Sequence, residues 1–188
     1  MSNRNLINND SLAKSRRTYL CLPKIEESAE FLSAVKESME LHHPWVEAPS
    51  SEEKFEQYIQ RINFDSHLGF FIRQRSDRQL IGVVNINEIV KGVFQSGYLG
   101  FYAFKKCSGQ GLMTEGLSLV LDVYFKTLKL HRLEANIQPE NSKSINLIKR
   151  LNFRREGFSP KYLKINGQWR DHERYAMTLE DYEENINE

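Results

Sequence analysis

Two glycines, Gly109 and Gly111, lie between a strand-like run ending near Phe104 and a long apolar run beginning near Leu112. Glycine adopts backbone angles that let consecutive amide N–H groups converge on an anion, and a helix start adds the positive end of its dipole. The stretch Lys106–Thr114 is therefore predicted to bind a phosphate-bearing cofactor, although the same glycines would also suit a plain tight turn.

The two most common nucleotide-binding loops do not match this stretch. The dinucleotide fingerprint requires a third glycine three positions after the second, and that position is Thr114. The P-loop requires a Gly-Lys-Ser/Thr ending, and none follows Gly109. Neither common nucleotide-binding pattern therefore explains the two glycines, and a plain strand-to-helix turn stays open.

Composition limits the classes of protein that remain. The chain has 188 residues, 40% of them hydrophobic, and 26 Lys+Arg residues are balanced by 25 Asp+Glu residues. The resulting net charge of +1 is far below the positive charge that most nucleic-acid-binding proteins carry, so no direct nucleic-acid contact is expected. No apolar run has transmembrane length, and Cys21 and Cys107 form no disulfide framework, so we expect a cytoplasmic protein without membrane contact.

The chain divides into three parts by composition. Residues 1–15 are rich in asparagine and are predicted to form a flexible tail. Residues 16–180 are expected to form a single domain, because no linker or repeat interrupts them, and residues 181–188 are expected to form a C-terminal tail.

Hydrophobic periodicity predicts an α+β, or mixed α/β, fold. Asn141 is a good N-cap for the helix that follows it, Asn152 suits a left-handed residue after that helix, and Asn166–Gly167 is a strong type I′ hairpin signal. The expected elements are strands over 17–22, 68–73, 80–90, 94–104, 131–137, 153–165 and 168–179, and helices over 25–39, 51–64, 110–128 and 142–151.

Two motifs resemble the GCN5-related N-acetyltransferase (GNAT) family. Lys106, Gly109 and Gly111 match its cofactor signature, with lysine replacing the usual glutamine or arginine. Asn141 and Ser144 match a second signature, whose closing Gly-Phe is Asn-Phe here. The segments 109–115, 131–132, 156–157 and 166–172 resemble the RimJ/RimL branch, the ribosomal-protein alanine N-acetyltransferases.

The resemblance implies a fold and a co-substrate. The fold would be a mostly antiparallel twisted sheet of about seven strands with a splayed strand pair, flanked by about four helices. Acetyl-CoA would place its pyrophosphate on the glycine loop and its pantetheine arm between the splayed strands. The implied contacts are Phe101, Ala103, Phe104, Lys106, Cys107, Ser108, Gly109, Gln110, Gly111, Leu112, Met113, Thr114, Asn136, Asn141 and Ser144.

The resemblance also suggests catalytic roles. A backbone amide near Ala103 or Phe104 would stabilise the oxyanion, and Ser144 would protonate the leaving thiolate, unless it only contacts CoA or caps its helix. The position that holds a glutamate base in many relatives is Tyr98, so no carboxylate base can be transferred from the family. Tyr98, His42, His43 or Asp171 could act as a weak base or be structural.

A weak base suits an N-terminal α-amine, whose pKa lies near 8, better than a lysine amine near 10.4. The candidate acceptor-binding residues lie in the loop between the first two helices and in the final hairpin: His42, His43, Trp45, Trp169 and Asp171. Alternatively, Trp45 packs in the core and Arg170 pairs with Asp171. No metal site is expected, because the adjacent histidines lack a third ligand at suitable spacing.

The sequence thus predicts acetyl transfer from acetyl-CoA to a protein N-terminus, with a ribosomal protein as partner and a homodimer left open. Two alternatives stay open. One is acetylation of a small amine such as a polyamine or aminoglycoside. The other is a non-catalytic acetyl-CoA-binding factor for ribosome assembly.

Overall fold

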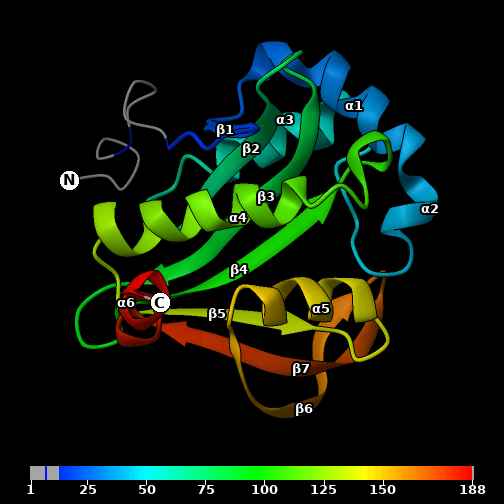
Figure 1. Cartoon of the computed structure of the whole chain (residues 1–188). Coiled ribbons are helices and arrows are strands. Elements are labelled where there is room, and N and C mark those ends of the chain that lie inside the picture. The colour runs from blue at the N-terminus through cyan, green and yellow to red at the C-terminus, as the bar shows by residue number, and fades with distance from the viewer. Residues whose placement is uncertain (1–6, 8–12, 188) are drawn as a thin grey trace.

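A seven-stranded sheet with strand order β1-β2-β3-β4-β5-β7-β6 forms the centre of the molecule (Figure 1). The structure is a computed structural model of the chain, and it describes Ile7 and residues 13–187. All neighbouring strands are antiparallel except β4 and β5, which are parallel. The strands are β1 (Thr18–Cys21), β2 (Leu68–Gln74), β3 (Leu80–Val90), β4 (Ser96–Ala103), β5 (Arg132–Ile137), β6 (Arg154–Ile165) and β7 (Gln168–Thr178).

Helices cover both faces of this sheet, and the predicted α+β class is confirmed. The helices are α1 (Ser28–Glu37), α2 (Met39–His42), α3 (Glu52–Arg61), α4 (Leu112–Asp122), α5 (Ser142–Arg150) and α6 (Leu179–Asn187), with short 3-10 turns at Ile25–Glu27 and Lys105–Cys107. Helices α4 and α5 contribute to one buried cluster, while α1 and α3 contribute to another on the opposite face.

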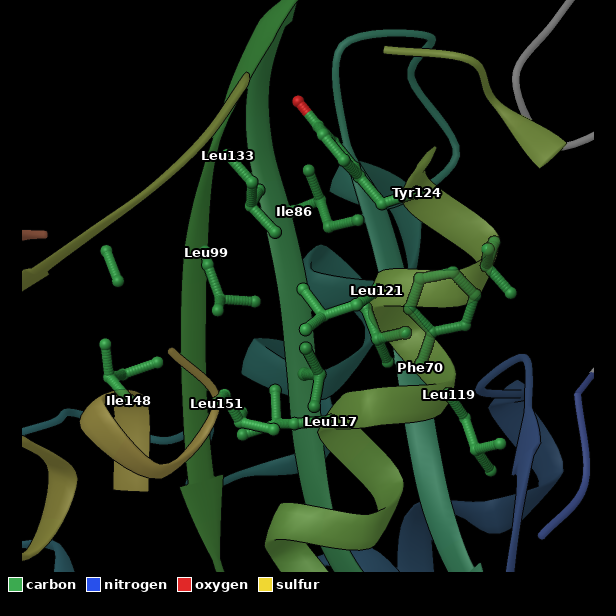
Figure 2. Close-up of a cluster of buried hydrophobic side chains, with 14 of the residues drawn as sticks. Phe70, Ile86, Leu99, Leu117, Leu119, Leu121, Tyr124, Leu133, Ile148 and Leu151 are labelled. Carbon is green, nitrogen blue, oxygen red and sulfur yellow. The ribbon is translucent and has the colours of Figure 1, made fainter. Parts of the chain in front are cut away.

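Helix α4 lies close against the sheet because of its composition. Its apolar side chains, among them Leu117 and Leu121, meet Phe70 and Ile86 of the neighbouring strands (Figure 2). Gly116 permits this approach, since a Cβ built at that position would lie 2.5 Å from side-chain atoms of Ile72. The glycine that weakens the helix by propensity thus brings it onto β2.

On the other face, Phe31 of α1 is fully buried at the centre of an aromatic cluster. Its ring centroid lies 4.6 Å from that of Phe55 and 5.7 Å from that of Phe71. Phe104, at the end of β4, meets it edge-on at 6.0 Å. This cluster anchors α1 and α3 against the strands and holds the end of β4.

Two predicted helices differ from the observed ones. The helix expected over 25–39 breaks at Ser38, whose hydroxyl accepts a hydrogen bond from the Lys105 amide at 2.9 Å and so ties the break to the end of β4. The helix expected over 110–128 begins at Leu112 and changes to a π-helical turn over Val123–Thr127.

The two predicted tails also differ from what the structure describes. Residues 181–187 lie in α6 rather than in a tail, because the Tyr182 ring is buried and stacks 4.8 Å from Phe125. Of the predicted N-terminal tail, residues 1–6 and 8–12 lie outside the described residues, while Ile7 is buried. Ser15 is bonded to Glu115 of α4.

Local turn signals are confirmed. Asn166 and Gly167 have φ angles of 49° and 77°, as a type I′ turn requires, and they join β6 to β7. Asn152 follows α5 with a φ of 60°, which is the left-handed conformation expected after a helix. These residues set the position of the final hairpin.

Candidate functional site

The parallel strands β4 and β5 separate after a short paired segment. Their register contains only three pairs, the last joining Tyr98 to Glu134. Beyond that pair, β4 continues to Ala103 alongside β3, while β5 continues to Ile137 alongside β7. Figure 1 shows the two strands diverging, with the backbone edge of each facing the gap. Such edges carry N–H and C=O groups that can bind an extended polar molecule.

The pairing of β4 with β3 determines which backbone amides of β4 face the gap. The amide of Phe104 donates to the carbonyl of Ile81 at 2.8 Å, so it is already used and cannot stabilise an oxyanion in the gap. Because successive amides of a strand alternate in direction, the amides of Ala103 and Phe101 point toward the gap. The oxyanion position expected near Ala103 or Phe104 is thus restricted to the Ala103 side.

The glycine loop follows β4 directly and is open to solvent. Gly109 and Gly111 have φ angles of 80° and 76°, in the left-handed region that favours glycine. A Cβ built on Gly109 would meet no described atom within 4 Å, and one built on Gly111 would meet only the Arg17 guanidinium, at 3.6 Å. Gly111 is the N-cap of α4, so the first amides of that helix have no partner within it. This arrangement is suited to binding a phosphate group.

Many predicted cofactor residues can contribute only their backbone. The side chains of Phe104, Cys107, Leu112 and Met113 are buried in the core. Lys106 is exposed, and its ammonium pairs with Glu37 at 3.1 Å. The structure therefore places main-chain amides, rather than a set of side chains, around the open space in front of the loop.

Glu115, in the first turn of α4, binds Ser15 and Arg17, which precede β1. Its carboxylate accepts hydrogen bonds from the Ser15 hydroxyl and, at 2.7 Å each, from the backbone and side chain of Arg17. Burial alone would raise the pKa of Glu115, but these bonds and the Arg17 charge outweigh it and lower that pKa to about 2. Arg17 also donates to the carbonyl of Gln110 at 3.2 Å, so it supports the loop.

Helix α5 begins beside the other side of the gap. The Asn141 side chain accepts a hydrogen bond from the Ser144 amide at 3.2 Å, which confirms the predicted N-cap. Ser144 is half-buried in the first turn of α5. Because α4 follows β4 and α5 follows β5, both helices start at the end of the sheet where the strands diverge (Figure 1).

Asn136 lies on β5 beyond the last pair with β4. Its side-chain oxygen is buried and has no hydrogen-bond partner among the described residues. A buried carbonyl oxygen without a donor costs about 1–3 kcal/mol, so its presence favours a donor supplied by a bound molecule. The open strand edges, the glycine loop and this unpaired oxygen together fit the amide-containing arm and the pyrophosphate of CoA.

His42 contacts the β4 edge from α2. Its Nε2 lies 2.9 Å from the Ala103 carbonyl oxygen, and because a carbonyl only accepts, Nε2 carries the proton. Nδ1 is buried without a partner among the described residues. Burial lowers the pKa of His42, and the bond to Ala103 offsets this only in part, so the ring is neutral near pH 7. His42 therefore positions the strand that borders the gap.

The segment after α2 is hydrogen-bonded to the final hairpin. The Asn166 side chain donates to the Pro44 carbonyl, and the Gln138 side chain donates to the Trp45 carbonyl, each at 3.3 Å. A cavity of about 600 Å³ opens beside this junction. Its lining includes Lys36, Met39, His42, His43, Glu47 and Asn166.

The remaining predicted acceptor residues are spread along the hairpin and the loop. Trp169 is 60% exposed, and Trp45 is only partly buried, so neither indole is a core residue. The Asp171 carboxylate accepts a hydrogen bond from the Lys161 amide at 2.7 Å. No ion pair joins Arg170 to Asp171 within the described part of the chain. The structure thus brings His42 and His43 to the cavity and leaves Trp169 and Asp171 on the hairpin.

Tyr98 lies at the last strand pair and is 37% exposed. Burial, together with Tyr162 and Glu134 nearby, raises the pKa of Tyr98. Its hydroxyl therefore stays protonated at neutral pH and is better suited to donate a hydrogen bond than to act as a phenolate base. Glu134 was missed by sequence reasoning; alternation along β5 could have placed it on the Tyr98 face, but the register could not be known.

A family model described as an acetyltransferase (GNAT) domain matches residues 17–154. The chain belongs to the GNAT acetyltransferase family. Among relatives of this GNAT chain, the probable N-acetyltransferase YjcK of Bacillus subtilis is 38% identical over 128 residues, covering 68% of the chain and 71% of the relative. These matches show that the chain is an N-acetyltransferase.

A more specific likeness covers about half of the chain. The [ribosomal protein uS5]-alanine N-acetyltransferase of Escherichia coli is 41% identical over 106 residues, 56% of this GNAT chain and 55% of that enzyme. The solved structure of Mycobacterium smegmatis RimJ in complex with CoA-disulfide has the same fold, with a TM-score of 0.83, 24% identity and coverage of 90% and 88%. The spermidine N(1)-acetyltransferase of E. coli is 27% identical over 140 residues, 70% of the chain and 73% of that enzyme.

The described residues of the GNAT chain contain neither a membrane-spanning helix nor a cluster of metal-binding side chains. None of the described helices is both long enough and apolar enough to cross a membrane. Within the same residues, no group of three or more His, Cys, Asp or Glu side chains is arranged to hold a metal ion.

Proposed function

We propose that this GNAT chain transfers the acetyl group of acetyl-CoA to the N-terminal α-amine of a protein, and that the acceptor is a ribosomal protein. The observation that carries the proposal is the gap between β4 and β5 with the glycine loop at its end. The likeness to the uS5-alanine enzyme supports the acceptor class.

Acetyl-CoA fits the residues around the gap. The amides from Gly109 to Thr114 would receive the pyrophosphate, because the two glycines leave the space in front of them free. The amides of Phe101 and Ala103 and the unpaired oxygen of Asn136 would bind the pantetheine arm. When bound, acetyl-CoA supplies an activated thioester, and the chain only has to position it and move protons.

Groups of the chain itself assist both the attack of the amine and the departure of the thiolate. The acceptor nitrogen attacks the thioester carbon, and the Ala103 amide stabilises the oxyanion that forms. Ser144, in the first turn of α5, donates a proton to the departing thiolate. Tyr98, on the opposite face of the sheet from α4 and α5, orients the acceptor amine through its hydroxyl.

The cavity beside α2 supports a peptide acceptor. Its volume of about 600 Å³ accommodates several residues of an extended chain, and its lining carries charges of both signs, Lys36 and Glu47. A polyamine would favour a uniformly acidic surface, so this lining favours a peptide. The spermidine acetyltransferase relative keeps a small amine as the second candidate acceptor.

Release of free thiol from acetyl-CoA tests the proposal. Peptides that copy ribosomal-protein N-termini should release thiol, whereas the same peptides with a blocked α-amine and spermidine should release little. Spermidine as the only productive acceptor would establish the small-amine alternative. Tight acetyl-CoA binding without thiol release from any amine would favour the non-catalytic binding module.

A further inference from the structure

Glu134 is a carboxylate at the point where β4 and β5 separate, and the reaction proposed above assigns it no role. Its backbone pairs with Tyr98 in the last β4–β5 pair, so both side chains lie on the same face of the sheet. That face is opposite the one packed on α4 and α5, because Leu133 and Ala135 belong to that core. Glu134 therefore faces the side from which an acceptor can approach the thioester.

Arg132 orients the Glu134 carboxylate through one hydrogen bond. Its Nε donates to Oε1 of Glu134 at 2.9 Å, while its Nη1 donates to Glu156 at 3.1 Å. Among the described residues, no hydrogen bond reaches Oε2 of Glu134, and its side chain is 18% exposed. Arg154 also pairs with Glu156, at 3.5 Å, and with Asp181, at 2.9 Å. The two guanidinium groups thus serve the carboxylates of Glu134, Glu156 and Asp181, so this network carries a net negative charge, and Oε2 of Glu134 accepts no hydrogen bond from the described residues.

The other groups around Glu134 come from each neighbouring element. Tyr98 faces it from β4, and Tyr162 of β6 lies beside Tyr98. The Tyr124 hydroxyl, from the π-helical turn after α4, donates to the Arg132 carbonyl at 2.6 Å. The facing residue on β7 is Ala176, which cannot titrate. Arg154 of β6 lies opposite Ala176 and pairs with Glu156 at 3.5 Å. Beyond these phenols, Arg132, Glu156 and Arg154, no ion pair within the described part of the chain joins a lysine or histidine to the Glu134 carboxylate.

We propose that Glu134 is the proton acceptor for the acceptor amine in the acetyl transfer proposed above. An ammonium N–H bond breaks as the proton passes through water to Oε2 of Glu134, because Glu134 is level with Tyr98 and Ala103 lies further along β4. The freed nitrogen lone pair forms the C–N bond to the thioester carbon. After the attack the nitrogen still carries one proton more than the product amide, and it releases that proton to the solvent. The C–S bond of the thioester then breaks, and the thiolate takes a proton from Ser144. A proton from the solvent restores the serine, and Glu134 releases its own proton to the solvent.

The test compares Glu134→Gln with Glu156→Gln in the full chain, because both residues bind Arg132 but only Glu134 lies at the strand separation. Near pH 7, Glu134→Gln should lower kcat/KM for an N-terminal peptide about 100-fold. The deficit should shrink toward about pH 9, where the amine is already neutral. Glu156→Gln should stay within about threefold of the wild type at both pH values, and Glu134→Asp should regain part of the activity.

Acetyl-CoA affinity and the unfolding midpoint, measured on the same samples, should be unchanged in Glu134→Gln. Wild-type kcat/KM in Glu134→Gln across the pH range would overturn the inference. Equal, pH-independent losses in Glu134→Gln and Glu156→Gln would also overturn it, since they would show that both act only through Arg132. A wild type without activity on any amine would instead refute the proposed function, and this inference with it.

Discussion

Gly109 and Gly111 both have positive φ angles, which favour glycine. The space in front of Gly109 is empty of protein atoms, so neither a close helix nor a neighbouring strand requires the missing side chain. Gly92 and Gly167 share the positive φ and the open surroundings, so the glycine loop is distinguished by its place after β4, where Gly111 is the N-cap of α4 and the first amides of that helix have no partner within it. A substitution at Gly109 therefore tests the cofactor assignment directly.

Gly109→Val should weaken acetyl-CoA binding at least about tenfold, because the side chain would fill the space in front of the amides. Gly92→Val is the matched control, since Gly92 has a φ of 73°, an equally empty surrounding and a position in the distant β3–β4 turn. Both variants should lose about 1–2 kcal/mol of unfolding free energy from backbone strain. Titration calorimetry showing equal acetyl-CoA affinity in the two variants would remove the pyrophosphate from this loop.

At the residue scale, sequence reasoning succeeds where the cause is local. The angles of Asn152 and the Asn166–Gly167 turn follow from neighbours along the chain, and the structure confirms them. Glu134 could not be found in this way, because its position beside Tyr98 depends on the register of β5 with β4. Helix α4 separates these two strands in the sequence, so the register cannot be predicted from neighbouring residues. His42 was included among the candidates, but its contact with the Ala103 carbonyl depends on the same tertiary packing.

Among the elements, α4 links the fold to the site. It buries most of its surface against β1, β2 and β3, and its first turn forms part of the glycine loop. Gly116 sets its distance from β2, because Ile72 already occupies the space that a Cβ would need. The position of the loop amides thus depends on packing one turn further along the helix.

Gly116→Val should therefore lower the unfolding free energy by about 2–3 kcal/mol through overpacking against Ile72. Ser118→Val, at an exposed position of the same helix, introduces the same side chain and should cost less than about 0.5 kcal/mol. Urea unfolding of the two variants measures the difference. Equal stabilities would mean that α4 can shift away from β2 at little cost.

The strands were predicted more accurately than the helices. The expected strands match the observed ones closely, since alternation and turn residues define them locally. The break at Ser38 and helix α6 were not predicted, because the first depends on the Lys105 amide and the second on the Phe125 ring. Each of these elements is stabilised by a residue distant in sequence.

For the whole molecule, the gap between β4 and β5 separates two surfaces with different roles. Helices α4 and α5 and the glycine loop provide one side, suited to the cofactor, while α2, the hairpin and Glu134 provide the other. The two would meet only at the thioester. This division means that cofactor affinity and acceptor choice should respond to different substitutions.

The most direct test of this account uses one peptide that carries both a free N-terminal α-amine and an internal lysine. After incubation with acetyl-CoA and the protein, fragmentation mass spectrometry identifies the acetylated nitrogen. We expect one acetyl group, on the α-amine, because the pKa of that amine lies about two to three units below that of lysine. An acetyl group on the lysine side chain, or transfer to spermidine but not to this peptide, would contradict it.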